Sequence, residues 1–220
     1  MKIRIAIFAV IILVLGGAYW YAVQTGDDRL SAQELKALGL VELTVPTEVG
    51  ELVLLDHQAA DFGAEDLKGK WTYAFFGYTH CPDICPITLS LLRETEEQLS
   101  ENASSEVFSQ FRGMFVSVDP TRDDVETVKR FVSHFSPNFV GLTGTEANIK
   151  QFADTVGVGF MRMGSNTSAL EYLVEHQGHI VIFSPDGSCY GYIKPPHDPT
   201  QLARIFRYLV SSSQEAQTSS

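Results

Sequence analysis

Cysteine and basic side chains are scarce in this sequence of 220 residues. Only three cysteines are present, too few for a disulfide framework, so any thiol chemistry depends on a few positions. Lysine and arginine number 16 against 27 aspartates and glutamates, and the resulting net charge of -11 excludes nucleic-acid binding, which depends on neutralising phosphates. Internal repeats are missing as well. With 45% apolar residues the chain suffices for one core, which excludes a disordered protein.

The sequence has only one long apolar run, and it lies near the N-terminus. Every residue over 5–23 is apolar, aromatic or glycine, and a helix of that length spans roughly a bilayer core. Lys2 and Arg4 precede the run and the first acidic residues follow it, so the positive-inside rule keeps the N-terminus in the cytoplasm. Aromatic residues 19–21 stand where a cleaved signal peptide has small residues. We therefore expect an uncleaved, single-pass anchor in the cytoplasmic (inner) membrane, with the domain facing the periplasm.

Strand-like and helix-like patterns alternate through the rest of the chain. Residues 71–77 form a continuous run typical of a strand buried on both faces, and residues 113–118 form a second strand after a helix. Residues 179–184 and 188–193 flank a Pro-Asp-Gly turn, which predicts a hairpin. A βαβ unit followed by a hairpin and a terminal helix is typical of a thioredoxin-like fold. The predicted fold class is therefore α/β and thioredoxin-like, as a single domain with an N-terminal transmembrane helix.

Domain boundaries follow from these patterns. The sequence predicts a membrane anchor, a linker, one thioredoxin-like domain and a flexible tail rich in Ser and Gln. Asp198 as an N-cap and Pro199 at the first helical position predict where the terminal helix begins. The boundaries are, in order, 1–24, 25–47, 48–212 and 213–220.

Cys81 and Cys85 form a C-x-x-x-C pair directly after the first predicted strand. Each precedes a proline, so the next helix is expected to start near Pro86. Amide N–H groups at a helix start lower a thiol pKa, which makes thiolate available for redox exchange or metal binding. Soft thiolates select Cu(I) or Zn(II), but a structural zinc site needs four ligands and no second close cysteine pair is present. A copper site needs only one further ligand, and imidazole suits copper.

Six histidines are candidates for that further ligand. His176 and His179 form an H-x-x-H pattern at a predicted strand, where odd spacing sends the two rings to opposite faces. Periodicity does not decide which of them faces the cysteine loop. His134 is expected near a helix end, where a solvated ring is the simpler interpretation. His57 and His197 are expected in a hairpin region and a turn, without chemical neighbours in sequence. His80 is expected either to be a turn residue or to tune the thiol of the adjacent Cys81.

Residues 76–86, Phe-Gly-Tyr-Thr-His-Cys-Pro-Asp-Ile-Cys-Pro, resemble the signature of the SCO/SenC family of copper-binding assembly proteins. Two further stretches agree with the family in order and spacing: Val-Asp-Pro-Thr-Arg-Asp over 118–123 and Tyr-Leu-Val-Glu-His over 172–176. The family has its ligand histidine at the same distance before a Pro-Asp-Gly turn. The resemblance therefore selects His176 over His179.

This resemblance implies a membrane-tethered protein that binds copper through two cysteines and one histidine, here Cys81, Cys85 and His176. Family members help to build the CuA centre of cytochrome c oxidase, so the CuA-bearing subunit is the expected partner. Thiol-disulfide exchange with the cysteines of that subunit is the other activity attributed to the family, and we expect a metallochaperone more than an enzyme. Glu175 stands where Asp is usual, which removes no ligand. Because an exported compartment is oxidising and ligation needs thiolates, a thioredoxin-like reductant is a further expected partner.

Two more residues are of interest near these motifs. Asp119 follows the second predicted strand and is expected either to lie near the cysteine loop and assist partner docking, or to open a turn before Pro120. Cys189, in the second strand of the hairpin, is expected to be a small buried hydrophobe rather than a ligand.

Overall fold

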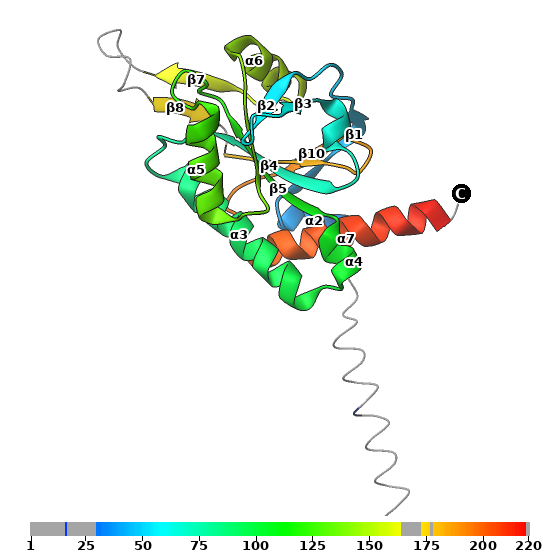
Figure 1. Cartoon of the computed structure of the whole chain (residues 1–220). Helices are drawn as coiled ribbons and strands as arrows, with labels where there is room; N and C mark the ends of the chain where they lie inside the picture. The colour runs from blue at the N-terminus through cyan, green and yellow to red at the C-terminus, as the bar shows by residue number, and fades with distance from the viewer. Residues whose placement is uncertain (1–15, 17–29, 164–172, 177, 219–220) are drawn as a thin grey trace, which may run out of the picture.

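The computed structural model describes residue 16 and residues 30–163, 173–176 and 178–218. The anchor expected over 1–24 lies outside these residues except at Gly16. Within the described part, no helix combines the length and apolar character needed to cross a bilayer. This part forms a mixed sheet of eight strands, a separate pair of short strands, and helices on both faces of the main sheet (Figure 1). The predicted α/β class is confirmed.

Three parallel strands form the centre of the main sheet: β4 (Trp71–Gly77), β5 (Phe111–Ser117) and β6 (Val140–Thr143). The connecting helices are α3 (Ile84–Asn102) and α4 (Ser105–Ser109) between β4 and β5, and α5 (Val125–Phe135) between β5 and β6. β4 is buried over its whole length, which is why its sequence lacks polar alternation. The carboxyl ends of β4 and β5 meet where Gly77 pairs with Ser117.

Antiparallel strands extend the sheet on both sides in the order β1-β10-β9-β4-β5-β6-β2-β3. These strands are β1 (Leu40–Thr47), β2 (Leu54–Asp56), β3 (Asp61–Phe62), β9 (Ile180–Phe183) and β10 (Cys189–Ile193). Because β9 is antiparallel to β4, the start of β9 lies beside the end of β4, where Ile180 pairs with Phe75. β9 and β10 are the predicted hairpin.

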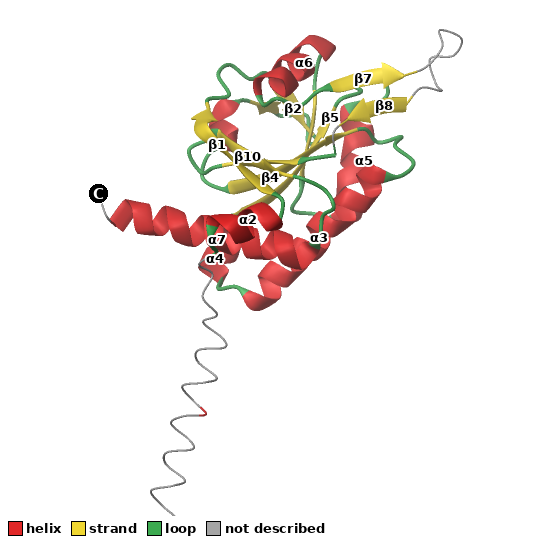
Figure 2. Ribbon diagram, turned by 180° about the vertical axis from the view of Figure 1, so that it is seen from behind, coloured by secondary structure: helices red, strands yellow, loops and turns green. Residues whose placement is uncertain are grey.

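Helices cover both faces of the main sheet. The remaining long helices are α6 (Glu146–Thr155) and α7 (Pro199–Thr218). α7 lies on the same face as α3, and there Tyr73 of β4 packs edge to face against Phe206, with ring centres 6.3 Å apart. α6 lies on the opposite face (Figure 2). There Phe152 packs against Phe76 of β4, with ring centres 5.3 Å apart. The central strand is therefore enclosed from both sides.

A separate ribbon of two strands follows α6. It consists of β7 (Phe160–Met163) and β8 (Leu173–His176). The two strands are antiparallel, and His176 stands opposite Phe160. β8 contacts β4 of the main sheet. The sequence patterns do not predict this ribbon, because two four-residue strands are too short to establish a period.

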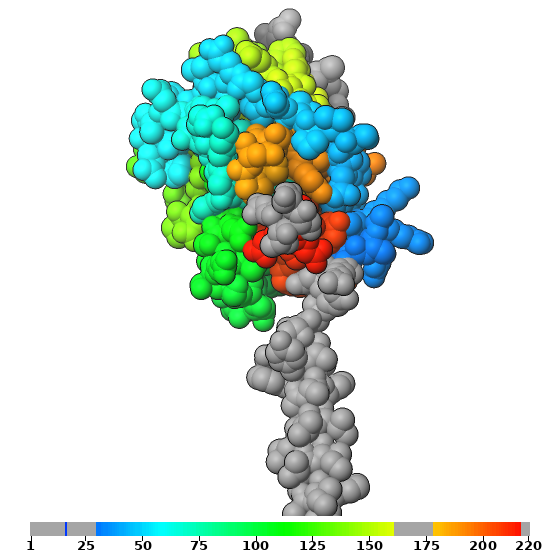
Figure 3. All heavy atoms as spheres, turned by 90° about the vertical axis from the view of Figure 1, so that its right-hand side faces the viewer, coloured from blue at the N-terminus to red at the C-terminus, as the bar shows by residue number. Residues whose placement is uncertain are grey.

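The sequence predicts a linker over 25–47, but the second half of this segment is a helix and a strand in the structure. Residues of this segment form α2 (Ala32–Ala37) and β1. Leu35 of α2 is buried, and Leu40 at the start of β1 pairs with Ile193 of β10. Figure 3 shows this N-terminal segment, in blue, beside the C-terminal segments in orange and red. Periodicity misses β1 because an edge strand is mostly exposed and its partner comes much later in the sequence.

The flexible tail predicted over 213–220 is helical as far as Thr218, where α7 ends. The hydroxyls of Ser211, Ser212 and Ser213 donate to carbonyl oxygens three residues earlier, at distances of 2.8–3.1 Å. These local bonds satisfy the serine side chains along the helix, so a Ser-rich sequence does not end it here.

Candidate metal centre

The C-x-x-x-C pair lies at the carboxyl end of β4, where a strand ends and a helix begins. β4 stops at Gly77, and α3 starts at Ile84, two residues before the predicted Pro86. Cys85 is thus the second residue of the helix and is fully buried, whereas Cys81 lies in the preceding turn and is half-buried. The pair therefore combines one partly exposed thiol with one buried thiol.

The two thiols interact with each other and with the end of β4. Cys81 is near enough to raise the pKa of the Cys85 thiol, whereas the backbone of Tyr78 lowers it. The Cys85 sulfur also fills the space beside Gly77, where an added Cβ atom would lie 2.8 Å from Cys85 Sγ. Only glycine at this position leaves the sulfur in place. The loop thus brings together two soft donors of the kind that bind Cu(I).

Burial raises the pKa of the Cys85 thiol, and the neighbouring Cys81 and Asp123 add to this effect. The predicted lowering of the thiol pKa at the helix start is therefore wrong for Cys85. The physical reason is that burial removes the water that would solvate a thiolate, and this outweighs the lowering that the backbone of Tyr78 contributes. A bound cation compensates a buried thiolate charge, so a metal ion bound at this thiol would displace its proton.

A buried aspartate, Asp123, holds the loop to the neighbouring strands. Its Oδ2 accepts the Thr79 N–H at 2.9 Å and the Ser117 hydroxyl at 2.7 Å. Its Oδ1 accepts the Thr79 hydroxyl at 2.6 Å and lies 3.5 Å from Nδ1 of His80. The carbonyl oxygen of Asp123 accepts the hydroxyl of Thr143 on β6 at 2.8 Å. One residue thus ties the turn before the first cysteine to the ends of β5 and β6.

Asp119 supports the same loop from inside the protein. It is fully buried and pairs with Arg122, whose guanidinium lies 5.6 Å from the ring centre of Tyr78. Its carbonyl oxygen accepts the N–H groups of Arg122 and Asp123 at 3.1 and 3.0 Å, which closes a turn. The turn interpretation of Asp119 is confirmed. Through Arg122 and Tyr78 it also lies beside the cysteine loop, and a role in partner docking stays a prediction.

The third predicted ligand, His176, is the last residue of β8. Its backbone position is known from the pairing with Phe160, while its side chain lies outside the described part of the structure. β8 contacts β4, the strand that leads into the thiol loop. Among the side chains that are described, no group of three His, Cys, Asp or Glu is arranged to hold a metal ion. The assignment of His176 as a ligand stays a prediction.

Two other histidines lie at structural positions away from the thiols. Nδ1 of His57 accepts the Gly141 N–H at 3.2 Å, which connects the turn after β2 to β6. His134 is exposed in the last turn of α5, where its ring packs edge to face with Phe135. The exposed ring of His134 agrees with its prediction, whereas the half-buried ring of His57 is held by its bond to Gly141.

His179 and His197 have contacts that the sequence patterns do not predict. The ring of His179 stacks on Tyr192 of β10, with ring centres 5.0 Å apart. Nε2 of His197 lies 2.8 Å from the carbonyl oxygen of Gly178. These contacts join segments that are distant in sequence, so no local motif indicates them.

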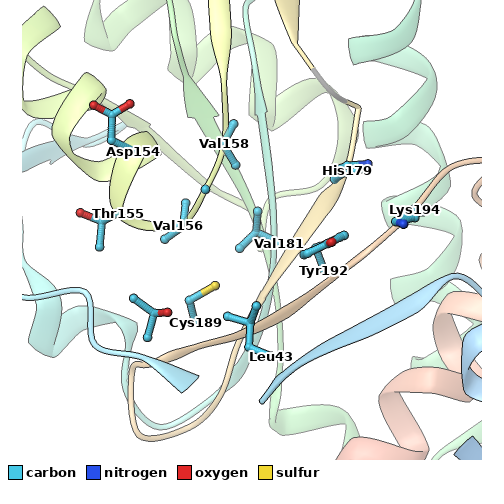
Figure 4. A pocket seen from close by; sticks show the side chains of 12 residues that line it. Leu43, Asp154, Thr155, Val156, Val158, His179, Val181, Cys189, Tyr192 and Lys194 are labelled. Carbon is cyan, nitrogen blue, oxygen red and sulfur yellow. The ribbon is translucent and has the colours of Figure 1, made fainter. Parts of the chain in front are cut away.

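A cavity of about 680 Å³ lies on the α6 face of the sheet, between β1, the β9–β10 hairpin and the end of α6 (Figure 4). His179, Cys189, Tyr192 and Lys194 line it from the sheet, and neither thiol of the C-x-x-x-C pair takes part. Cys189 is almost fully buried, and burial raises its pKa to about 11. The prediction that Cys189 behaves as a buried hydrophobe is confirmed.

The family model described as SCO1/SenC matches residues 43–211, and the chain therefore belongs to the SCO1/SenC family. Among individual relatives, it is 34% identical over 191 residues to Protein SCO2 homolog, mitochondrial, of Danio rerio. That match covers 87% of this chain and 66% of the Danio rerio protein, slightly less than two thirds of its length. The chain is also 33% identical to a putative copper-binding protein of Stutzerimonas stutzeri, over 77% of this chain and 81% of that protein.

Solved structures of Sco proteins have the same fold. The crystal structure of Arabidopsis thaliana ScoI with copper bound matches with a TM-score of 0.67 and 31% identity, over 74% of this chain and 98% of that chain. Yeast Sco1 with copper bound matches with a TM-score of 0.68 and 27% identity, over 76% of this chain and 90% of that chain. Copper, the metal expected from the sequence, is the metal bound in these relatives.

Replacing Asp123 by Asn is expected to destabilise the thiol loop, because an amide NH₂ group cannot accept the bonds that one carboxylate oxygen now receives. We expect the free energy of unfolding to fall by about 1–3 kcal/mol, measured by chemical denaturation of the reduced full chain in detergent. Asp124→Asn is the matched control, since Asp124 is the N-cap of α5 and accepts the Thr127 N–H at 2.8 Å, a role that Asn fills equally well. Equal stability of the two variants would contradict the role of Asp123.

Alkylation of the three thiols is expected to follow their exposure. Cys81 is partly exposed, whereas Cys85 and Cys189 are buried and have raised pKa values, so both keep their protons and react slowly at neutral pH. Brief treatment of the reduced, metal-free full chain with iodoacetamide, followed by peptide mass spectrometry, should modify Cys81 first. Modification of Cys189 at the same rate would show that it is not buried.

Proposed function

We propose that this chain is a membrane-tethered copper metallochaperone that assists assembly of the CuA centre of cytochrome c oxidase. The observation that carries the proposal is the pair of interacting thiols at the end of β4, in a chain of the SCO1/SenC family. The copper-bound structures of Arabidopsis thaliana ScoI and yeast Sco1 support copper as the cargo. Cys81, Cys85 and His176 are the proposed ligands.

The unequal exposure of the two thiols suits a site that releases its metal. Cys85 is held against Gly77 inside the protein, which favours retention of an ion. Cys81 is partly exposed, so a ligand of a partner protein can approach the metal from its side. Two thiolates and one imidazole also form a soft donor set of low coordination number, which suits Cu(I) better than the four-ligand requirement of structural zinc.

The proposed setting is the periplasmic face of the cytoplasmic membrane. The apolar run over 5–23 serves as the anchor, and the cations before it keep the N-terminus in the cytoplasm. The proposed partner is the oxidase subunit that carries the CuA site. Because the compartment is oxidising, a thioredoxin-like reductant keeps Cys81 and Cys85 in the thiol form that binds copper.

Copper loading of the reduced full chain in detergent tests the site. The wild type is expected to bind about one copper ion per chain, and Cys81→Ala, Cys85→Ala and His176→Ala are each expected to lose most of it, because each removes a soft donor. Copper is measured by elemental analysis after competition with a chelator. Cys189→Ala and His134→Ala are matched controls, since both residues lie away from the thiol loop.

Two results would contradict the proposal. Wild-type affinity in His176→Ala would remove that residue from the ligand set. Failure of the reduced wild type to bind copper more tightly than Cys81→Ala would overturn the metallochaperone function itself.

A second candidate function is thiol-disulfide exchange, favoured by the same unequal exposure of the two neighbouring thiols. The Cys81 thiolate attacks a target disulfide to form a mixed disulfide and release one target thiolate. The released target thiolate accepts the proton of Cys85, and the Cys85 sulfur then attacks Cys81. This releases the second target sulfur and leaves a Cys81–Cys85 disulfide and a target reduced by two electrons. This function needs no histidine, so reduction of a disulfide target by His176→Ala at the wild-type rate, together with weak copper binding by the wild type, would favour it.

The membrane topology gives a separate prediction. When alkaline phosphatase is fused after residue 218 and expressed in bacteria, the fusion is expected to be active and to sediment with membranes, because residues 1–24 anchor the chain and export the rest. Deletion of residues 1–24 should leave an inactive fusion in the cytoplasm. Mass spectrometry of the purified full-length protein is expected to recover peptides that include residues 2–24. A mature chain that begins after residue 24 would identify a cleaved signal peptide instead.

A further inference from the structure

The bend between β8 and β9 is held by a histidine from a later part of the chain. Gly178 lies in this bend with a φ of 67°, in the left-handed region that favours glycine. Its carbonyl oxygen lies 2.8 Å from Nε2 of His197. The bend comes two residues after His176 and two residues before Ile180, where β9 begins. The contact therefore acts on the short segment that follows the predicted histidine ligand.

The surroundings of the two His197 ring nitrogens determine the protonation state of the ring. A carbonyl oxygen only accepts, so Nε2 carries the hydrogen that is donated to Gly178. Nδ1 is buried and has no hydrogen-bond partner within the described part of the structure. A proton on Nδ1 would be desolvated without an acceptor, so the neutral ring fits this position. Burial and the nearby His179 also lower the pKa of His197, although the bond to Gly178 opposes this effect.

The His197 ring projects from a rigid support. The residue directly precedes the first turn of α7, where Oδ1 of Asp198 accepts the Gln201 N–H at 3.0 Å. The hydroxyl of Tyr73 on β4 donates to the carbonyl oxygen of Leu202 at 3.2 Å. The start of α7 is thus fastened to the strand that leads into the thiol loop. A continuous set of contacts runs from β4 through α7 to the bend after β8.

We propose that His197 is a positioning residue for the third copper ligand. Its hydrogen bond to Gly178 holds the backbone two residues after His176 against the start of α7, and Tyr73 joins that helix to β4, the strand that leads into the thiol loop. The ring acts as a support and not as a ligand, because Nε2 is engaged and Nδ1 is closed off from solvent. This inference rests on the proposed copper site and adds a residue to it that lies outside the ligand set.

The test uses the reduced full chain in detergent as wild type, His197→Leu and His197→Gln. Leucine fills part of the space but donates no hydrogen bond, whereas glutamine carries an amide N–H at a similar distance from the backbone. We expect His197→Leu to lower copper affinity by about tenfold, the lower end of the range for residues that orient metal ligands. We expect His197→Gln to recover most of that loss. His134→Gln is the control, because His134 is exposed and lies in the last turn of α5.

Two further readouts separate positioning from general stability. The EPR spectrum of the Cu(II)-loaded chain should change in His197→Leu and return toward that of the wild type in His197→Gln, because the spectrum reports ligand geometry. Thermal unfolding of the metal-free chain should be similar in the two variants. A merely structural role would instead lower the unfolding temperature of His197→Leu and leave the copper spectrum unchanged.

The results distinguish failure of this inference from failure of the copper site. Wild-type affinity and spectrum in His197→Leu, alongside loss of copper in His176→Ala, would overturn the role of His197 alone. An equal loss of affinity in the Leu and Gln variants would also overturn it, because the hydrogen bond would then not be the cause. Wild-type protein without specific copper binding would overturn the proposed function and this inference with it.

Discussion

The buried carboxylate of Asp123 joins the ends of two parallel strands, and the geometry of the thiol loop depends on it. Burial of a carboxylate is costly unless its oxygens accept hydrogen bonds, and here Thr79 and Ser117 supply them. Thr79 belongs to the loop that leads to Cys81, and Ser117 ends β5. The loop is therefore shaped by the sheet before any metal binds. This preorganisation is what a soft two-sulfur site needs, because few ligands hold the ion.

Unequal burial gives the two thiols different properties. Cys85 lies in the first turn of α3, yet burial raises its pKa, so the helix start does not by itself produce a thiolate there. In the proposed copper site, the charge of the ion would compensate for the lost hydration, which would couple metal binding to deprotonation. Cys81 stays partly exposed and, in the proposed functions, is the point of approach for a partner's metal ligand or a disulfide. Both proposed activities use the same asymmetry.

Several elements of the fold were predictable from local patterns. β4 was predicted with the bounds that the structure has, because a strand buried on both faces is a continuous apolar run. The start of α7 at Pro199 was predicted from its cap, and the bond from Gln201 to Asp198 confirms it. β1, α2 and the β7–β8 ribbon were missed. β1 lies at a sheet edge, where half-exposed side chains blur the pattern, and short elements are stabilised by partners far along the chain.

The sequence by itself determined the α/β class, the membership of the SCO1/SenC family and the two soft donors at Cys81 and Cys85. These follow from features that are local in the chain, namely apolar runs, turn residues and a motif of eleven consecutive residues. Only the tertiary structure decided which thiol is buried, that Asp119 faces inward, and that His197 reaches Gly178. Burial and long-range hydrogen bonds depend on how distant segments pack, and no local pattern encodes that packing.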